Sequence, residues 1–589
     1  MKKTLRKLTS LVLALLFTAS LPLTALALDL DVSQGSIVID SVNATQNDIA
    51  QAHNGSVNVT QSAPTENTVT VQDAVNVQVS IQATSDLNVT LDNVSINTGE
   101  TGTDADSAAI SIDRAAGATV TVELNGTNTL VSDEKHAGLE VSGSGQLVIQ
   151  DVSGKVNDDG SVGADGGSLT ATGGLYGAGI GSQYNGENVQ NITITGGTVT
   201  ANGGYDAAGI GGGFGSSASN ITISGGTVTS TGGYNGAGIG GGVNGNASDI
   251  TISGGTVTAN GNVAAAAIGG GSRGNASKIT ITDGTVNATG GYGGAGIGSG
   301  QYGEASNITI TGGTVTATGG SQAAGIGAGG GNGISHGLGG AENITITGGT
   351  VNAFGGSSGA GIGSGYNNEA DNIVITGGTV NAKGGQQGAG IGSGAYGEVG
   401  SIAISGGTVN ATGAYWSAGI GGVITDDTSI SFSGDAQVTA TGGTDANDIG
   451  GHKGNPAVTP DISNLSADGW YQAGADGEKI SGSSVTSAAA AAEQSVTPVC
   501  FTVDEAWQQS VQSGVLTVTS RTEAATLTLW GWGTDMLLNS GIHTLTFVTD
   551  QAETTLDLAQ LASGCEGGDV YALTHTGTQT TLTLNGEAV

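Results

Sequence analysis

The sequence has little charge, proline or cysteine. Charged residues make up 11% of its 589 residues, against about 25% in ordinary soluble domains, and there are 5 prolines and 2 cysteines. The charge is too sparse for a coiled coil, the prolines are too few for collagen, and the cysteines are too few for a disulfide-stapled miniprotein. Glycine is abundant instead, since its 111 residues are roughly 19% of the chain, against a usual value of about 7%. The length suggests several domains or one long repeat array.

Basic residues are especially scarce. The 13 Lys and Arg stand against 49 Asp and Glu, which gives a formal net charge of −36. An acidic surface repels phosphate backbones and disfavours adhesion to anionic lipid, so we expect no nucleic-acid partner. After the N-terminal segment, no apolar stretch reaches the length of about 18 residues that a membrane-spanning helix needs, so we expect no membrane insertion. The acidity indicates either solubility or loops that collect calcium.

The N-terminus has the pattern of an export signal. Four of the 13 basic residues fall in the first seven positions, and residues 8–17 are mostly apolar. Ala25-Leu26-Ala27 is a small-x-small cleavage site. The pattern predicts a signal peptide at residues 1–27 and a secreted protein, with the cell surface as a possible final location.

A tetrapeptide of the Ala-Gly-Ile-Gly type recurs along the chain. Seven of the nine steps between its isoleucines are 29 residues long, and the step from Ile326 to Ile362 is the longest, at 36. The isoleucines are Ile180, Ile210, Ile239, Ile268, Ile297, Ile326, Ile362, Ile391, Ile420 and Ile449. Two fainter copies, at Ile110 and Leu139, bring the number of units to twelve. A regular period in this range indicates a solenoid.

Each unit contains three short apolar stretches. In one copy these are Ile192–Thr195, Thr198–Ala201 and Ala208–Gly211, and the first two alternate β-branched apolar residues with Thr. Alternation of this kind predicts half-buried strands. One unit cannot bury its apolar residues alone, but stacked units can. The sequence therefore predicts an all-β, right-handed parallel β-helix with Gly-Gly corners and coils about 4.8 Å apart.

One asparagine position recurs just before the first strand of each unit. Stacked asparagines can form a hydrogen-bonded ladder, so we interpret this position as a structural corner. Its members are Asn191, Asn220, Asn307, Asn343 and Asn372, and Asp249, Lys278 and Ser401 interrupt it.

Composition divides the remaining chain. Residues 28–86 lack the repeat and are predicted to be an N-terminal β cap, residues 87–452 the β-helix, and residues 453–498 a linker. Residues 499–589 are richer in tryptophan and predict a small β-rich domain, with strands around Leu516, Leu527 and Leu545 expected to be antiparallel. Cys500 and Cys565 both lie in this last domain, where they form either a disulfide or two buried thiols.

The repeat also resembles a known family. The stretches Leu87–Leu91, Ala108–Ile110 and Ala137–Leu139, followed by copies of Gly-Gly-Thr-Val-Thr-Ala-Thr-Gly-Gly and Ala-Gly-Ile-Gly, are similar to secreted β-helix proteins of Gram-positive bacteria labelled as carbohydrate-binding-domain proteins. The resemblance covers roughly residues 87–451. It implies a parallel β-helix that binds polysaccharide, in some relatives together with calcium.

Catalytic patterns are not evident. The histidines are scattered, and the repeats offer few bases and no paired carboxylates, so we expect no enzyme and no required cofactor. Asp158, Asp159 and Asp165 lie among glycines in a long segment between Leu139 and Ile180. They are weak candidates for a calcium site, and a solvated acidic loop is the alternative.

Aromatic residues recur at turn positions. One set lies five residues before the repeat isoleucine, and a second set lies four or five residues after it. The first set is Tyr205, Tyr234, Tyr292 and Tyr415, and the second is Tyr184, Phe214, Tyr302, Tyr366 and Tyr396. Stacked coils would align each set into an intermittent stripe, on which the apolar faces of sugars can stack. The alternative is that these rings cover glycine-rich corners.

These observations favour a secreted or cell-surface protein without catalytic activity that binds polysaccharide or acts in adhesion. A structural spacer presenting the C-terminal domain is the first alternative, and a β-helix polysaccharide lyase or hydrolase is the second. Outward Thr-x-Thr pairs also occur in ice-binding solenoids, but Asn replaces the second Thr in several units, and Thr is common on strands.

Overall fold

The computed structural model describes residues 28–31, 36–40, 43–46, 49–52, 56–60, 78–99, 107–151, 166–331, 340–422, 428–451, 457–474, 477, 479–481, 501–504, 507–512, 514–539, 542–564 and 569–589. The predicted signal peptide (1–27) and both cysteines, Cys500 and Cys565, lie outside these ranges.

Each repeat folds into one coil of three short strands. In one coil, β16 (Val189–Ile194) is followed by β17 (Thr198–Asn202) and then by β18 (Ile210–Gly211). The Ile and Val side chains that alternate with Thr in β16 and β17 are fully buried, as is Ile210. Alternate side chains of each strand therefore point into the coil, and the others point outward.

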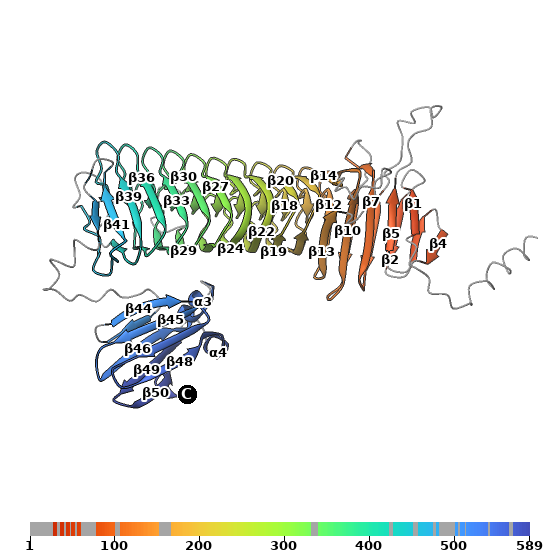
Figure 1. Ribbon diagram of the computed structural model, residues 1–589. Helices are drawn as coiled ribbons and strands as arrows, with labels where there is room; N and C mark the ends of the chain where they lie inside the picture. Colours follow the sequence, from red (N-terminus) through yellow and green to blue (C-terminus); the bar gives the residue numbers. More distant parts are fainter. Residues whose placement is uncertain are drawn as a thin grey trace, which may run out of the picture.

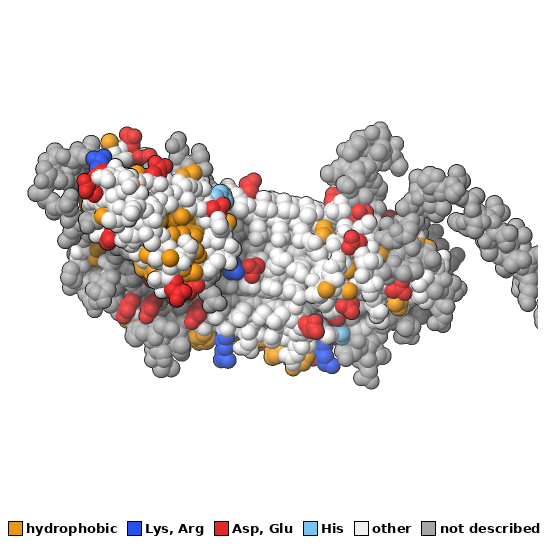
Figure 2. Space-filling view, turned by 90° about the horizontal axis from the view of Figure 1, so that it is seen from below, with side chains coloured by type: hydrophobic (Ala, Val, Ile, Leu, Met, Phe, Trp, Pro, Cys, Tyr) orange, Lys and Arg blue, Asp and Glu red, His pale blue; other side chains and the backbone are white. Residues whose placement is uncertain are grey.

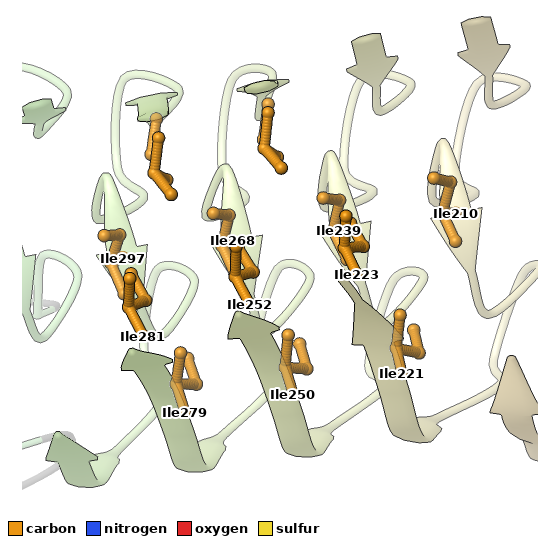
Figure 3. Packing of buried hydrophobic residues seen from close by; sticks show 14 of the residues in the cluster. Ile210, Ile221, Ile223, Ile239, Ile250, Ile252, Ile268, Ile279, Ile281 and Ile297 are labelled. Atoms are coloured by element: carbon orange, nitrogen blue, oxygen red, sulfur yellow. The ribbon is translucent and has the colours of Figure 1, made fainter. Parts of the chain in front are cut away.

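Successive coils stack in parallel and in register, which confirms the predicted parallel β-helix (Figure 1). Ile210 pairs with Ile180 of the preceding coil and with Ile239 of the following one. Figure 3 shows the row that continues through Ile268 and Ile297, with two further isoleucine rows beside it. Equivalent side chains thus lie on one another, and a continuous apolar core runs along the rod.

The first and second strands of the coils belong to one 26-stranded sheet. The first strands are β1 (Leu28–Asp31), β5 (Ser56–Thr60), β7 (Leu87–Asp92), β10 (Thr119–Asn125), β13 (Gln146–Asp151), β16, β19 (Ala218–Ile223), β26 (Ala305–Ile310), β29 (Ala341–Ile346), β32 (Ala370–Ile375), β35 (Ser401–Ile404) and β38 (Ser429–Phe432). The second strands are β8 (Ser95–Asn97), β11 (Thr127–Val131), β14 (Ser168–Thr172), β17, β20 (Thr227–Thr231), β27 (Thr314–Thr318), β30 (Thr350–Phe354), β33 (Thr379–Lys383), β36 (Thr408–Thr412), β39 (Gln437–Thr441) and β41 (Trp470–Ala473). In β22 (Ala247–Asn260) and β24 (Ala276–Thr289) the two strands are continuous.

The third strands form a separate 16-stranded sheet. Its parallel members are β2 (Ile37–Asp40), β6 (Val79–Ala83), β9 (Ile110–Arg114), β12 (Leu139–Gly143), β15 (Ile180–Gly181), β18, β21 (Ile239–Gly240), β23 (Ile268–Gly269), β25 (Ile297–Gly298), β28 (Ile326–Gly327), β31 (Ile362–Gly363), β34 (Ile391–Gly392), β37 (Ile420–Gly421) and β40 (Ile449–Gly450). From β15 onward each third strand is only the Ile-Gly pair of the repeat.

The glycine of that pair is required by the corner it makes. Gly211 has φ +134°, a conformation that residues with a side chain rarely adopt. A Cβ at this position would lie 2.0 Å from the carbonyl oxygen of Gly240 in the next coil. The close approach of successive coils therefore excludes every other residue type here.

The solenoid begins earlier than the repeat pattern indicates. Strand β5, inside the predicted cap of residues 28–86, pairs in parallel with β1 and β7, and β2 pairs in parallel with β6. The third-strand sheet has 16 strands, of which β3 (Asn43–Gln46) and β4 (Ile49–Ala52) are antiparallel, so fourteen coils have a third strand, against twelve predicted units. Among the described residues of the predicted cap, the β3–β4 hairpin is the part that departs from the coil.

The solenoid also ends later than predicted. Part of the predicted linker, residues 453–498, stacks on the last complete coil, because β41 pairs in parallel with β39. Strand β42 (Lys479–Ser481) then folds back antiparallel on β41. Tyr471 is buried against Phe432 with ring centroids 5.5 Å apart, so aromatic side chains cover the end of the core. These rings do not follow the repeat pattern, and sequence alternation therefore missed this coil.

The C-terminal domain is β-rich, as predicted, and has a core of its own. Its two sheets have the strand orders β43-β46-β49-β50-β51 and β44-β45-β47-β48. The strands are β43 (Phe501–Val503), β44 (Trp507–Gln512), β45 (Val515–Ser520), β46 (Ala524–Trp530), β47 (Thr544–Val548), β48 (Glu553–Asp557), β49 (Val570–Thr576), β50 (Gln579–Leu584) and β51 (Glu587–Ala588).

The strands around Leu516, Leu527 and Leu545 each have an antiparallel neighbour, as predicted, but two of them also lie side by side in a parallel pair. Leu516 and Leu545 are partners in the parallel pair β45–β47, whereas Leu527 lies in the other sheet. From β46 the chain returns to the sheet of β45 through helix α3 (Gly531–Asn539), and this crossover makes the pair β45–β47 parallel. A second helix, α4 (Leu558–Ser563), follows β48. Within the described residues, neither helix has the length and apolar character needed to cross a membrane.

Candidate functional site

In the coils from Ile180 to Ile391, two turns lie side by side and form one long edge of the rod. In the coil of Ile210, turn 2 (203–209) connects the second and third strands, and turn 3 (212–217) follows the third strand. The backbone N–H of Phe214 in turn 3 donates to the carbonyl oxygen of Tyr176 in turn 2 of the preceding coil, at 2.9 Å. The same bond recurs one coil later, from Val243 to Asp206 at 2.8 Å. Turns 2 and 3 are thus held together along the rod.

Exposed apolar side chains concentrate on this edge. Among the described residues, twelve large hydrophobic side chains are exposed, and nine of them belong to turns 2 and 3. The nine are Leu175, Tyr184, Tyr205, Tyr234, Tyr292, Tyr302, Tyr396, Tyr415 and Trp416. Most candidate residues from the sequence therefore lie at the surface and on one side of the fold.

The first aromatic set occupies turn 2. Tyr205 and Tyr234 lie on adjacent coils, with ring centroids 5.0 Å apart and an interplanar angle of 2°. Each ring therefore covers one face of the other. Tyr292 is the most exposed aromatic side chain described, at 55%, and within the described ranges it makes no ring contact. A sugar has more access to the faces of Tyr292 than to those of the stacked pair.

The second aromatic set divides into two positions of turn 3. Tyr184, Phe214 and Tyr366 lie four residues after the repeat isoleucine, whereas Tyr302 and Tyr396 lie five residues after it. At the later position the backbone is left-handed, with φ +67° at Tyr302 and +59° at Tyr396. The two positions therefore form two neighbouring rows, which contact each other where Tyr366 and Tyr396 pack edge to face at 5.6 Å.

Two aromatic residues of turn 2, Tyr176 and Trp416, were not predicted from the sequence. They lie four residues before the repeat isoleucine, whereas the first aromatic set lies five residues before it. Tyr176 contacts both Tyr184 and Phe214, with centroids 5.2 and 5.6 Å apart. Tyr184 and Phe214 are 5.1 Å apart, so the three rings form one cluster. Trp416 packs beside Tyr415 at 5.1 Å and is exposed like it.

A groove with a cavity volume of about 470 Å³ begins where turn 3 ends. Three of its five coils contribute three consecutive residues each, of which the middle one is a buried alanine at the floor, and the two end coils contribute one and two residues. The lining residues are Asn188, Ser217, Ala218, Ser219, Asn246, Ala247, Ser248, Asn275, Ala276, Ser277, Glu304 and Ser306. Its walls carry amide and hydroxyl groups and one carboxylate. This polar groove was not predicted, since Asn and Ser are ordinary surface residues in any one unit.

One wall of the groove is hydrogen-bonded from coil to coil. The Oδ1 atom of Asn188 accepts from the backbone N–H of Ser217, and the Oδ1 atoms of Asn246 and Asn275 accept from Asn275 and Glu304, each at 2.9 Å. Within the described ranges the Nδ2 groups of these three asparagines have no hydrogen-bond partner. The wall therefore has a fixed geometry and unused donors.

The opposite side of the groove is bounded by the predicted asparagine ladder. The ladder is confirmed at two steps, because Asn372 donates to Asn343 as Asn220 donates to Asn191. Where Asp249 and Lys278 interrupt it, an ion pair of 3.8 Å between Nζ and Oδ1 takes its place. Every residue of this row from Asn191 to Asn372 has a positive φ, which explains the preference for asparagine.

Charged groups are few along the rod, and Figure 2 shows them scattered over a mainly uncharged face. Arg114 is fully buried and donates to the carbonyl oxygens of Ser142, Gly143, Gln190 and Asn191. Burial lowers the pKa of Arg114 to about 10, an effect that Asp113 opposes. The guanidinium therefore stays charged at neutral pH and holds the main chain.

The calcium candidates Asp158, Asp159 and Asp165 lie outside the described residues. Across the described ranges, no group of three or more His, Cys, Asp and Glu side chains is placed to hold a metal ion.

Comparison with known proteins identifies the repeat. A family model described as "Beta helix repeat" matches nine segments: residues 165–184, 192–214, 221–243, 250–272, 279–301, 308–330, 344–366, 373–395 and 402–422. No curated protein and no solved structure matches the chain. The nine segments each cover most of one coil and end in or just before turn 3. These matches and the stacked coils identify residues 165–422 as a region of parallel β-helix repeats.

Proposed function

We propose that the chain is a secreted or cell-surface protein that binds polysaccharide without catalysing a reaction. The observation that carries the proposal is the concentration of nine of the twelve exposed large hydrophobic side chains of the described residues on turns 2 and 3. An exposed aromatic row is unfavourable in water and is typical of surfaces that bind a ligand. Sugar rings have apolar faces that stack on aromatic rings, so a glycan fits such an edge.

Repetition supports a polymeric ligand. Equivalent turns recur along the rod at the coil spacing of about 4.8 Å, which is close to the length of one sugar residue in an extended β-linked chain. A polysaccharide can then contact several coils with successive sugars, and many weak contacts add up in one bound chain.

We propose a binding protein and not an enzyme because of the residues that line the polar groove beside the aromatic edge. Hydrolysis of a glycosidic bond commonly needs two carboxyl groups that flank the bond. Glu304 is the one carboxylate among the residues that line the groove. The N-terminal export pattern supports the extracellular location.

Matched aromatic substitutions test the proposal. Tyr184 and Phe354 are both 37% exposed, but Tyr184 lies in turn 3, whereas Phe354 ends β30 outside the two turns. In a screen of immobilised polysaccharides, Tyr184→Ala and Tyr292→Ala should weaken retention of the full chain, and Phe354→Ala should not. If all three variants bind as the unmodified protein does, the aromatic edge is not the binding surface.

A further inference from the structure

We propose that the polar groove lined from Asn188 to Glu304 holds one extended, uncharged, β-linked polysaccharide chain parallel to the rod. This inference rests on the proposed function and names the subsite and the ligand class. The groove crosses five coils, so the four steps between them give a length of about 19 Å at a spacing of about 4.8 Å. A straight groove of that length accommodates several sugars of a straight chain, whereas α-linked glucans curl away from it.

The groove and the aromatic edge are adjacent. Phe214 lies three residues before Ser217, which lines the groove, and Tyr302 lies two residues before Glu304. A step of only two or three residues in turn 3 thus separates the aromatic edge from the groove. A polysaccharide in the groove has alanines beneath it, amide and hydroxyl groups beside it and aromatic rings along one side, which is the arrangement that sugars need for their hydroxyls and their apolar faces.

The side chains of the wall are positioned to recognise hydroxyl groups. Because Oδ1 of Asn246 is bound to the backbone N–H of Asn275, the orientation of the carboxamide is fixed at no cost when a ligand binds. Its Nδ2 group, which has no partner within the described ranges, remains as a donor. The same arrangement at Asn188 and Asn275 repeats this donor along the groove.

Charge favours an uncharged ligand over an acidic one. Glu304 lies in the groove, and Lys278, which borders it, is paired with Asp249 at 3.8 Å. Arg273, two residues before Asn275, is a second nearby cation, and Glu187, next to Asn188, is a third nearby carboxylate, so two cations and three anions border the site. With a net charge of −36 on the whole chain, an acidic polysaccharide is repelled at long range and gains no net local attraction.

Substitutions in the groove test this inference with the full chain. Asn246→Asp keeps the oxygen that accepts from Asn275 but replaces the donor amide by a carboxylate. Asn287→Asp is the matched control, because it adds the same charge at an exposed, outward position of β24 that belongs neither to the groove nor to turns 2 and 3. Ser248→Gln is an uncharged second variant that fills the groove from its other wall. Thermal unfolding checks that each variant is folded.

The probes are cello-, xylo- and manno-oligosaccharides, with malto-oligosaccharides and oligogalacturonates as α-linked and acidic comparisons, and calorimetric titration measures binding. Asn246→Asp and Ser248→Gln should each weaken binding of the best neutral probe by about tenfold or more, and Asn287→Asp should weaken it by less than about twofold. If Asn246→Asp and Ser248→Gln bind as the unmodified protein does, while Tyr292→Ala binds more weakly, the groove is not the binding site. The proposed function at the aromatic edge would then still hold. Preference for oligogalacturonates or malto-oligosaccharides also overturns the groove inference, and a protein that binds no polysaccharide overturns the proposed function as well.

Discussion

Asn220 donates a hydrogen bond from Nδ2 to Oδ1 of Asn191, its counterpart one coil earlier, at 2.6 Å. Both residues have left-handed backbone, with φ +52° and +60°. Asparagine tolerates this conformation better than most residues and carries both a donor and an acceptor. One residue type thus satisfies the backbone of the corner and links neighbouring coils.

Substitution of Asn220 separates these two roles. Asn220→Gly keeps the backbone conformation and loses the side-chain bond, whereas Asn220→Ala loses both. We expect Asn220→Ala to lower the free energy of unfolding by about 1 kcal/mol more than Asn220→Gly, measured by urea denaturation. Equal stability of the two variants would show that the positive φ does not select the residue.

The corner glycine allows a similar separation. Gly211→Ala places a Cβ 2.0 Å from a carbonyl oxygen of the next coil, whereas a Cβ added at Gly117, with φ +84°, would meet nothing within 4 Å. Gly117→Ala therefore introduces backbone strain without a clash. We expect Gly211→Ala to cost on the order of 4 kcal/mol and Gly117→Ala about 1 kcal/mol in thermal unfolding. The stacking distance would be wrong if Gly211→Ala were the milder change.

The isoleucine row is the third test. Ile210 is fully buried between Ile180 and Ile239. Ile210→Ala should reduce the free energy of unfolding by about 2–5 kcal/mol, and Ile210→Val by about 0.5–1.5 kcal/mol. Thr200→Ser, on the outward side of β17, is the control and should change stability little. A small effect of Ile210→Ala would contradict a packed row.

The core could be predicted from the sequence because burial in a strand depends on period-two alternation. Asn220 could be predicted to lie in a ladder because it recurs at the repeat period, but its positive φ could not, since a left-handed residue has no periodic signature. The groove could not be predicted, because the sequence does not show which outward-facing residues of neighbouring coils leave a hollow between them. Tyr302 and Tyr184 differ by one position in the turn, and the positive φ of Tyr302 shows that this small difference in spacing gives two separate rows.

The ends of the solenoid show the limit of the same reasoning. Tyr471 covers the core at Phe432, where the repeats bury isoleucine, so the last coil has no repeat pattern to detect. In the C-terminal domain, the parallel direction of β45 and β47 results from the crossover through α3. The alternation of apolar and polar residues around Leu545 predicts a strand but not the direction of its neighbour.

A buried histidine makes the stability of the C-terminal domain depend on pH. His575 is fully buried, with Nδ1 3.1 Å from Oγ1 of Thr549 and Nε2 2.9 Å from Oγ1 of Thr554. Burial lowers the pKa of His575 below its usual value of 6.5. The unfolded chain therefore binds a proton near pH 6.5 that the folded domain excludes, and stability is complete above that pH and declines as the pH falls below it.

Replacement of His575 tests this dependence. His575→Gln keeps a polar side chain that can bond to one of the threonines and does not titrate. Urea denaturation followed by tryptophan fluorescence, between pH 8 and pH 5, should show a smaller loss of stability in His575→Gln than in the unmodified protein. Parallel pH profiles for the two proteins would assign the dependence to other groups.

The stacking of coils can be measured directly by the distance between spin labels on one outward row. Thr200 pairs through successive coils with Thr229, Thr258, Asn287, Thr316, Asn352, Asn381 and Asn410. With Cys500 and Cys565 replaced by Ser, labels at Thr200→Cys and Asn352→Cys should lie about 24 Å apart, and labels at Thr200→Cys and Asn410→Cys about 34 Å apart. Two narrow distributions that differ by about 10 Å agree with one coil lying on the next. Broad distributions, or a separation that does not grow by two coil spacings, would contradict it.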